Sequence, residues 1–175
     1  RKNNVELNVI WIKSAACPGY FLDYFEPIPH VSFKKKINKY VKIDYKGCSV
    51  MKDFLPNYDK LELKPYIKKI ISDKLDILNK NYISVHIRRT DHIKLAKKNN
   101  HYTTDKEFID FLDKSDNDKN IYIATDNKIT YRKFKKKYQE RVKFKYHQTN
   151  NKVLRQTSLQ DAIIDIYMCV YSNDF

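Results

Sequence analysis

The sequence predicts an α/β fold built on a parallel sheet, and three observations in its second half carry this prediction. From residue 82 onward, short apolar runs alternate with helical segments in the order β-α-β-α-β-α. This alternation is typical of parallel strands joined by right-handed helical crossovers. The three runs YISVHIR, NIYIAT and RVKFKYH each lead into polar residues. We therefore expect a ligand site where the carboxyl ends of these strands meet.

The second half divides into six expected elements. In chain order they are a strand at 82–88, a helix from Thr103 or Thr104 to about 115, a strand at 120–125, a basic helix at 128–138, a strand at 141–147 and a helix to about 171. Thr157 and Gln160 form T-x-x-Q ahead of the last helix, which is the pattern of a capping box.

The first half has a weaker pattern. Residues 5–12 are expected to form a strand, and CPGYFLDYFEPIP after it is expected to form a loop with a short helix. HVSFKK and VKIDYKG are further strand candidates. Residues 63–79 have apolar side chains at helical spacing, and Pro65 suits a first helical turn.

Composition narrows the function classes without selecting one. The formal net charge of +14 over 175 residues comes mainly from lysines spread along the chain, with the densest run at 133–137. A nucleic-acid partner is one interpretation, but a solvated, lysine-rich surface is favoured. No apolar run is long enough for a transmembrane helix. The chain begins with Arg1 and reads as a fragment, so the sequence leaves the cellular compartment open.

Cysteine and glycine patterns exclude several common sites. Three cysteines fit no zinc template, and an odd count argues against a disulfide framework, with Cys17–Cys48 as the expected pair if there is one. With two glycines, the chain has neither a P-loop nor G-x-G-x-x-G. The D-x-D triplet at 116–118 lies in a polar turn at the wrong end of the next strand, so a metal role for it is not favoured.

The first predicted strand of the second half ends in His86-Ile87-Arg88-Arg89-Thr90-Asp91. Strand alternation places His86 and Arg88 on one face, whereas Arg89 points elsewhere unless the strand has already ended. A guanidinium suits a phosphate, so the pattern indicates anion binding. An equally supported alternative is an Arg–Asp pair, with Asp91 or Asp126 as the acid, that closes the end of the sheet.

Asp165 lies in DAIIDIYMCV, a helix that is apolar on most sides and is expected to be buried. A buried carboxylate needs donors. It is either a core aspartate bonded to a backbone amide or an acceptor for the N–H groups of a ligand, such as a guanine edge. Asp161 lies one turn earlier on the same face.

These residues resemble a known family. SVHIRRTD is similar to the H-x-R-R-x-D motif of the fucosyltransferase superfamily, which includes α-1,6-fucosyltransferases, nodulation fucosyltransferases and protein O-fucosyltransferases. IYIATDN resembles the family's strand followed by A-T-D-D, with Asn127 in place of the second Asp. TSLQDAIIDIYMCVYSNDF resembles its N-S-L-x-x-x-I-L-D-I-x-x-L-S-x-x-D-F helix, and VIWI near the start resembles its early strand.

The resemblance implies a GT-B-like architecture, in which two Rossmann-like domains, each with helices on both faces of a parallel sheet, flank the active site. Residues 1–80 would be part of the N-terminal, acceptor-side domain. Residues 81–175 would be the C-terminal, nucleotide-sugar-binding domain, truncated here. The family's phosphate-contacting Ser-rich stretch would follow Phe175, and its Gly-Asn-Arg-Leu-type loop would precede Arg1.

The resemblance also implies a function. It predicts a metal-independent, inverting transfer of fucose from GDP-fucose to a glycan or glycoprotein acceptor, with no cofactor. The site residues that it implies are the catalytic pair Arg88, for the β-phosphate, and Arg89, near the donor sugar; His86 and Asp165, for ribose and guanine; and the motif aspartates Asp91 and Asp126. The alternatives are a transferase of another nucleotide sugar, a basic nucleic-acid-binding module and a non-catalytic homologue.

Overall fold

The computed structural model describes residues 7–13, 17–34, 60–90, 93–147 and 157–175. The chain divides into two compact units, 1–68 and 69–175, whereas the expected boundary lay at 80/81. Helix α2, Pro65–Ile77, contains this division and matches the helix expected at 63–79. Each unit is mixed α/β and contains a small parallel sheet.

The first unit is a short β-α-β arrangement. Strand β1, Leu7–Ile10, pairs in parallel with β2, Val31–Lys34, and helix α1, Phe21–Tyr24, lies between them in the chain. Phe21 stacks on Phe33 of β2 at a ring distance of 4.8 Å. These elements match the expected strands at 5–12 and 30–35 and the short helix, while the candidate strand VKIDYKG and Cys48 lie outside the described residues.

The second unit contains the sheet that positions the candidate site. Strand β3, Tyr82–Ile87, pairs in parallel with β4, Asn120–Thr125, in a register that sets Ser84 opposite Tyr122 and Ile87 opposite Thr125. Both strands lie where the sequence predicts them. The connection between them contains α3, Ile93–Lys98, which was not predicted, and α4, Asp105–Asp113.

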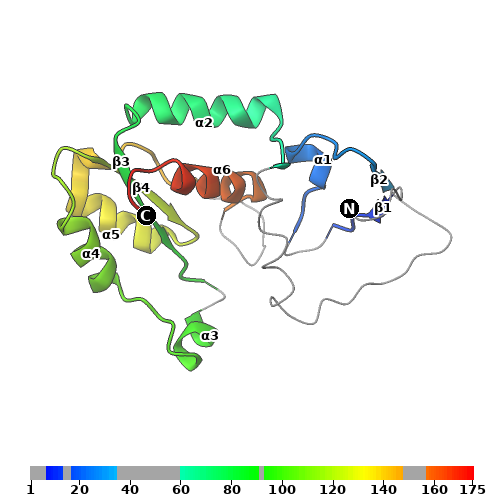
Figure 1. Ribbon diagram of the computed structural model, residues 1–175. Helices are drawn as coiled ribbons and strands as arrows, with labels where there is room; N and C mark the ends of the chain where they lie inside the picture. The colour runs from blue at the N-terminus through cyan, green and yellow to red at the C-terminus, as the bar shows by residue number, and fades with distance from the viewer. Residues whose placement is uncertain (1–6, 14–16, 35–59, 91–92, 148–156) are drawn as a thin grey trace. The chain divides into compact units, whose positions relative to one another are not determined.

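Helices cover both faces of β3 and β4, which explains why these strands are buried on both sides. On one face, Ile83, Val85 and Ile87 form a core with residues of α4 and of α5, Lys128–Tyr138. On the other face lies α6, Leu159–Val170: the Tyr82 hydroxyl donates to the Met168 carbonyl at 2.6 Å. Figure 1 shows α6 on one side of the strands and α4 and α5 on the other. The predicted strand faces are therefore confirmed.

The segment that follows α6 pairs with the edge of β3 that does not face β4. Asp174 forms a parallel bridge with Ile83, and the Ser84 amide donates to the Asp174 carbonyl at 3.0 Å. The chain thus passes from β3 to β4 on one edge of β3, and the segment after α6 returns to its other edge. The carboxyl end of β3 lies at the point where the order of neighbouring segments reverses, and such a point is where open α/β sheets bind ligands.

The strand predicted at 141–147 is wrong. The 3-10 turn η2, Gln139–Arg141, occupies its start, and no strand follows among the described residues up to 147. Side chains from α5 satisfy the backbone here instead of a ladder: Lys135 Nζ donates to the Gln139 and Val142 carbonyls at 2.7 Å each, and the Tyr131 hydroxyl donates to the Phe144 carbonyl. The alternation of buried and exposed residues survives without the strand.

Two predicted helix starts can be compared with the structure. Thr104 caps α4, and its capping box with Glu107 confirms one of the two expected positions. The capping box of α6 consists of Ser158 and Asp161, so the predicted pair Thr157 and Gln160 is wrong by one residue. Within the described segments, no helix is both long and apolar enough to cross a membrane.

Candidate functional site

A cavity of about 440 Å³ opens at the carboxyl ends of β3 and β4. Its charged and polar lining comes from three elements that are far apart in the sequence, together with Thr157 ahead of α6. His86 and Arg88 come from the end of β3, Thr125 and Asp126 from the end of β4, and Asp165 from the middle of α6. Apolar side chains of α6, including Ile166 and Val170, complete the wall. The cavity therefore combines cationic, anionic and apolar groups.

Asp126 organises the chain where β3 ends. Its Oδ1 accepts the Arg89 backbone amide at 2.7 Å, and its Oδ2 accepts the Thr90 hydroxyl. The Asp126 side chain is buried, with 9% of its surface exposed. These bonds between the ends of the two strands hold the backbone on which Arg88 and Arg89 are carried.

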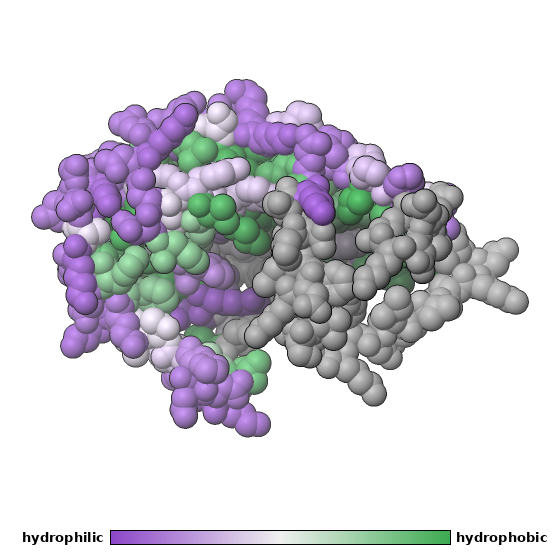
Figure 2. Space-filling model, in the orientation of Figure 1, coloured by the Kyte–Doolittle hydropathy of each residue, from purple (hydrophilic) through white to green (hydrophobic). Residues whose placement is uncertain are grey.

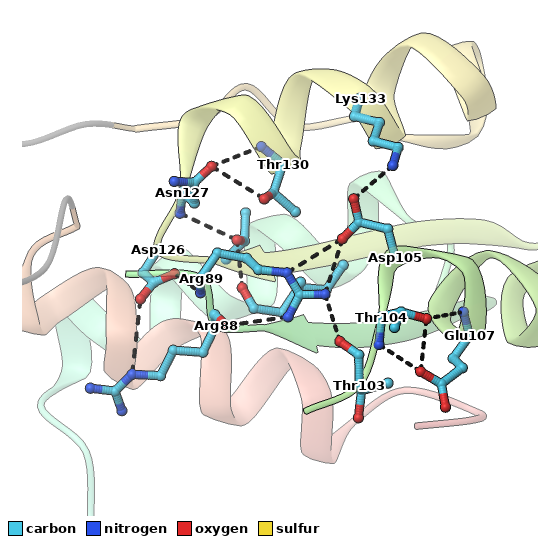
Figure 3. A network of polar contacts seen from close by, with 12 residues as sticks. Arg88, Arg89, Thr103, Thr104, Asp105, Glu107, Asp126, Asn127, Thr130 and Lys133 are labelled. Carbon is cyan, nitrogen blue, oxygen red and sulfur yellow. Dashed lines mark hydrogen bonds and ion pairs between the residues drawn. The ribbon is translucent and has the colours of Figure 1, made fainter. Parts of the chain in front are cut away.

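The two arginines point to different sides of this backbone (Figure 3). Arg88 lines the cavity and keeps 30% of its side chain exposed, with its Nε 3.9 Å from Asp126 Oδ2. This separation is too long for a hydrogen bond, so the pair is an ion pair of modest strength. The sequence alternative of an Arg–Asp pair closing the sheet is present in this loose form.

Arg89 is enclosed on the opposite side, and its side chain is 10% exposed. Its guanidinium donates to Asp105 Oδ1 at 3.0 Å and to the Thr103 carbonyl at 2.8 Å. It also lies over the rings of Tyr102 and Phe108, at 4.9 and 5.5 Å from their centroids. The structure thus separates Arg89 from the cavity that Arg88 lines.

Asp105 receives a second cation, since Lys133 of α5 donates to its Oδ2 at 2.7 Å. Burial by itself would raise the pKa of Asp105, but the hydrogen bonds from Lys133 and Arg89 outweigh it and lower that pKa below its ordinary value. The result is an ionised, doubly paired carboxylate that joins α4, α5 and the end of β3.

Asp165 has the opposite environment. Its Oδ1 accepts the Tyr122 hydroxyl at 2.6 Å, a neutral side-chain donor rather than the backbone amide considered above. Burial, opposed by the Tyr122 hydrogen bond and by Lys74 and reinforced by the nearby Asp161, raises the pKa of Asp165 to about 6. A carboxylate kept partly desolvated beside a cavity is well suited to accept N–H groups of a ligand.

The predicted site residues thus divide into three groups. His86, Arg88, Asp126 and Asp165 are brought together around one cavity. Arg89 lies in the separate Asp105 network, and Asp91 lies outside the described residues. Sequence reasoning missed Tyr122, although its position opposite Ser84 in the register assigns it to the face of the sheet covered by α6.

Among the described residues, no group of three or more His, Cys, Asp or Glu side chains is arranged to hold a metal ion. The D-x-D turn at 116–118 is bound by Arg141, whose guanidinium donates to the Asp116 carbonyl at 2.9 Å and, through Nε, to the Lys119 carbonyl at 2.8 Å. These contacts support a structural role for this turn.

The comparisons with known proteins do not assign this chain to a family. A scan against protein-family models finds no model that matches, and a search of curated proteins finds none that is significantly similar.

Proposed function

We propose that this chain is part of a glycosyltransferase of GT-B-like architecture that moves fucose from GDP-fucose to a glycan or glycoprotein acceptor, with inversion and without a metal. The observation that carries the proposal is the meeting of His86, Arg88 and Asp165 around one cavity at the carboxyl end of β3. The three residues are distant in sequence, and the motif resemblance assigns all three to the same nucleotide-sugar donor.

The chemistry of the cavity fits the two ends of a nucleoside diphosphate. Arg88 supplies a permanently charged, planar guanidinium for the diphosphate. Asp165 supplies an acceptor for the N–H groups of guanine, and His86 lies on the Arg88 side for the ribose. Inverting transfer through an oxocarbenium-like transition state requires charge to be stabilised on the departing diphosphate, which a fixed guanidinium does without a metal.

The nucleic-acid alternative is weakened by how the lysines of α5 are used. Lys133 pairs with Asp105 at 2.7 Å, Lys137 pairs with Asp113 at 3.0 Å, and Lys135 donates to two carbonyls. Hydrophilic residues do cover much of the visible surface around α2, α4 and α5 (Figure 2). The densest basic run is nevertheless largely engaged within the protein, which supports a solvated structural face over a phosphate-binding one.

A thermal-shift panel on the full-length protein tests the proposal. GDP and GDP-fucose should raise the melting temperature, GDP-mannose should report on sugar selectivity, and EDTA should leave the GDP shift unchanged. Stabilisation by UDP but not by GDP would contradict the assignment. A steep loss of polynucleotide affinity with increasing salt, in the absence of a GDP effect, would favour the nucleic-acid alternative.

A further inference from the structure

We propose that Tyr122 is a positioning residue for Asp165, fixing its carboxylate so that it can receive the base of the bound nucleotide. This inference rests on the proposed nucleotide-sugar function and adds a residue that the motif resemblance does not assign. The observation behind it is the 2.6 Å hydrogen bond from the Tyr122 hydroxyl to Asp165 Oδ1, which joins β4 to α6 beside the cavity.

Tyr122 is held rigidly enough for this task. It is 5% exposed. Its register partner Ser84 bonds to Ser172, which follows the C-terminal end of α6. Its ring meets Tyr82 and Phe144 edge-on, at centroid distances of 6.4 and 5.7 Å. Contacts on two sides leave the phenol few alternative orientations, so its hydroxyl defines where the Asp165 carboxylate must lie.

A neutral donor positions the carboxylate without cancelling its charge. Burial is the first cause that raises the pKa of Tyr122 well above its ordinary value, with the Asp165 charge second, so the phenol stays protonated and donates. An arginine at this place would pair with Asp165 as Arg89 pairs with Asp105. With Tyr122 bound to Oδ1, Oδ2 is the acceptor that faces a ligand N–H in this proposal.

Asp165 also lines a second, smaller cavity of about 50 Å³, together with Lys74, Tyr122 and Asp161. Lys74 lies over the Phe144 ring at 4.0 Å and over the Tyr122 ring at 5.7 Å. The charge of Lys74 also lowers the pKa of Asp165. Asp161 is committed to the cap of α6 through bonds with Ser158. The Asp165 carboxylate is thus stabilised by Tyr122 of β4 and by Lys74 of α2, whereas the charge of Asp161 opposes its ionisation.

The titratable and charged groups around Asp165 set its pKa, and with it the acid limb of GDP binding, which is the fall in GDP affinity as Asp165 becomes protonated at low pH. They are Tyr122 from β4, Lys74 from α2, Asp161 and Cys169 from α6, Tyr146 from the segment after η2, and His86, Arg88 and Asp126 across the larger cavity. The Tyr122 hydrogen bond and the Lys74 charge lower the pKa of Asp165, whereas Asp161 raises it. Loss of the Tyr122 hydroxyl should therefore raise the pKa of Asp165 further, and GDP affinity should begin to fall at a higher pH.

The test measures GDP and pyrophosphate binding by calorimetry from pH 5.5 to 8.5 for the wild type and for Tyr122→Phe in the full-length protein. GDP affinity of the variant should fall about tenfold at pH 7, as for one hydrogen bond to a charged group, while pyrophosphate affinity stays unchanged. The midpoint of the acid limb should move to higher pH. Tyr138→Phe is the matched control, because it also removes a tyrosine hydroxyl that donates to an aspartate, here Asp113 at 2.9 Å.

A double-mutant cycle with Asp165→Asn completes the test. Asp165→Asn should abolish the acid limb, and adding Tyr122→Phe to it should cost little more GDP affinity, because the two residues act as one unit. If Tyr122→Phe leaves the GDP affinity and acid limb of the wild type unchanged, or weakens GDP and pyrophosphate equally, the positioning role is overturned while GDP binding stands. If the wild type does not bind GDP, the proposed function itself is overturned, and the positioning role with it.

Discussion

Two carboxylates on either side of the β3 end have opposite surroundings. Asp105 receives two cations, Arg89 at 3.0 Å and Lys133 at 2.7 Å, and its pKa lies below the ordinary value because their hydrogen bonds outweigh burial. Asp165 receives the neutral Tyr122 hydroxyl, and burial raises its pKa to about 6. Both are charged near neutral pH, but the charge of Asp105 is compensated within the protein.

Under the proposed function, this difference separates charges that stabilise the fold from charges that bind the ligand. The Arg89–Asp105–Lys133 network joins three elements and orders the chain after β3 (Figure 3). Arg88 and Asp165, in contrast, both line the cavity in which we propose that the nucleotide binds. A site that binds a charged ligand must leave some of its charged groups available to that ligand. A network that only stabilises the fold can instead pair all its charged groups within the protein.

The largest expected effect comes from Arg88. For the proposed transferase, Arg88→Lys should lower kcat about a hundredfold or more while the fold is preserved, because lysine keeps the charge but loses the planar fork. Donor-saturated turnover, with circular dichroism as a folding check, measures this effect. Arg132→Lys, at an exposed position on α5, is the matched control. Near-full turnover in Arg88→Lys would place leaving-group stabilisation elsewhere.

Arg89 should act on stability. Arg89→Met should lower the free energy of unfolding by about 2–3 kcal/mol, because it removes charge-assisted bonds from a half-buried carboxylate. Urea denaturation measures the loss. Lys137→Met removes an exposed partner of Asp113 and should cost under about 1 kcal/mol. The motif resemblance places Arg89 near the donor sugar, so unchanged stability combined with weaker donor binding would favour that role over the structural one.

Asp165→Asn should stabilise the protein at pH 8. The native pKa of Asp165, about 6, exceeds its ordinary value of 3.8, so ionisation costs stability as pH rises through that interval. With partial exposure taken into account, the gain should be about 1–2 kcal/mol above pH 6 and should vanish below pH ~4. Melting curves across pH measure it.

Asp105→Asn is the contrasting variant. The lowered native pKa of Asp105 means that its charge stabilises the fold above its ordinary pKa, and this contribution is lost as pH falls through the native pKa. Asp105→Asn should therefore destabilise the protein at neutral pH. Stability changes of the same sign in the two variants would contradict the comparison.

GDP should also bind Asp165→Asn more weakly, with pyrophosphate affected less.

Within the Arg89–Asp105–Lys133 network, the smallest effect should come from Lys133, the exposed partner of Asp105. Its side chain is 54% exposed, so Lys133→Met should cost at most about 0.5–1 kcal/mol. Added salt should reduce this cost, whereas the cost of Arg89→Met should persist because Arg89 is shielded from solvent. Paired urea curves at low and high salt measure both. If Lys133→Met lowers stability as much as Arg89→Met does, the stability contributed by the Arg89–Asp105–Lys133 network depends on net charge rather than on the guanidinium geometry.

The sequence by itself predicted the strands β3 and β4, their faces, the main helices and the placement of His86, Arg88 and Asp126 at one edge of the sheet, whereas Asp165 was joined to them only by the motif resemblance. These features depend on local periodicity and on the rule that parallel strands end at one edge, so they can be read from residues near each other in the chain. The capping box of Thr104 followed from local chemistry in the same way.

Only the tertiary structure decided how each charge is partnered. Tyr122 and Asp165 are 43 residues apart, and Arg89 and Asp105 are 16 apart, so neither pairing has a local signal. The strand expected at 141–147 failed for the same reason, because Lys135 and Tyr131 of α5 satisfy carbonyls that a ladder would otherwise have bonded. Side-chain partners across elements set the role of each charge, and sequence spacing does not encode them.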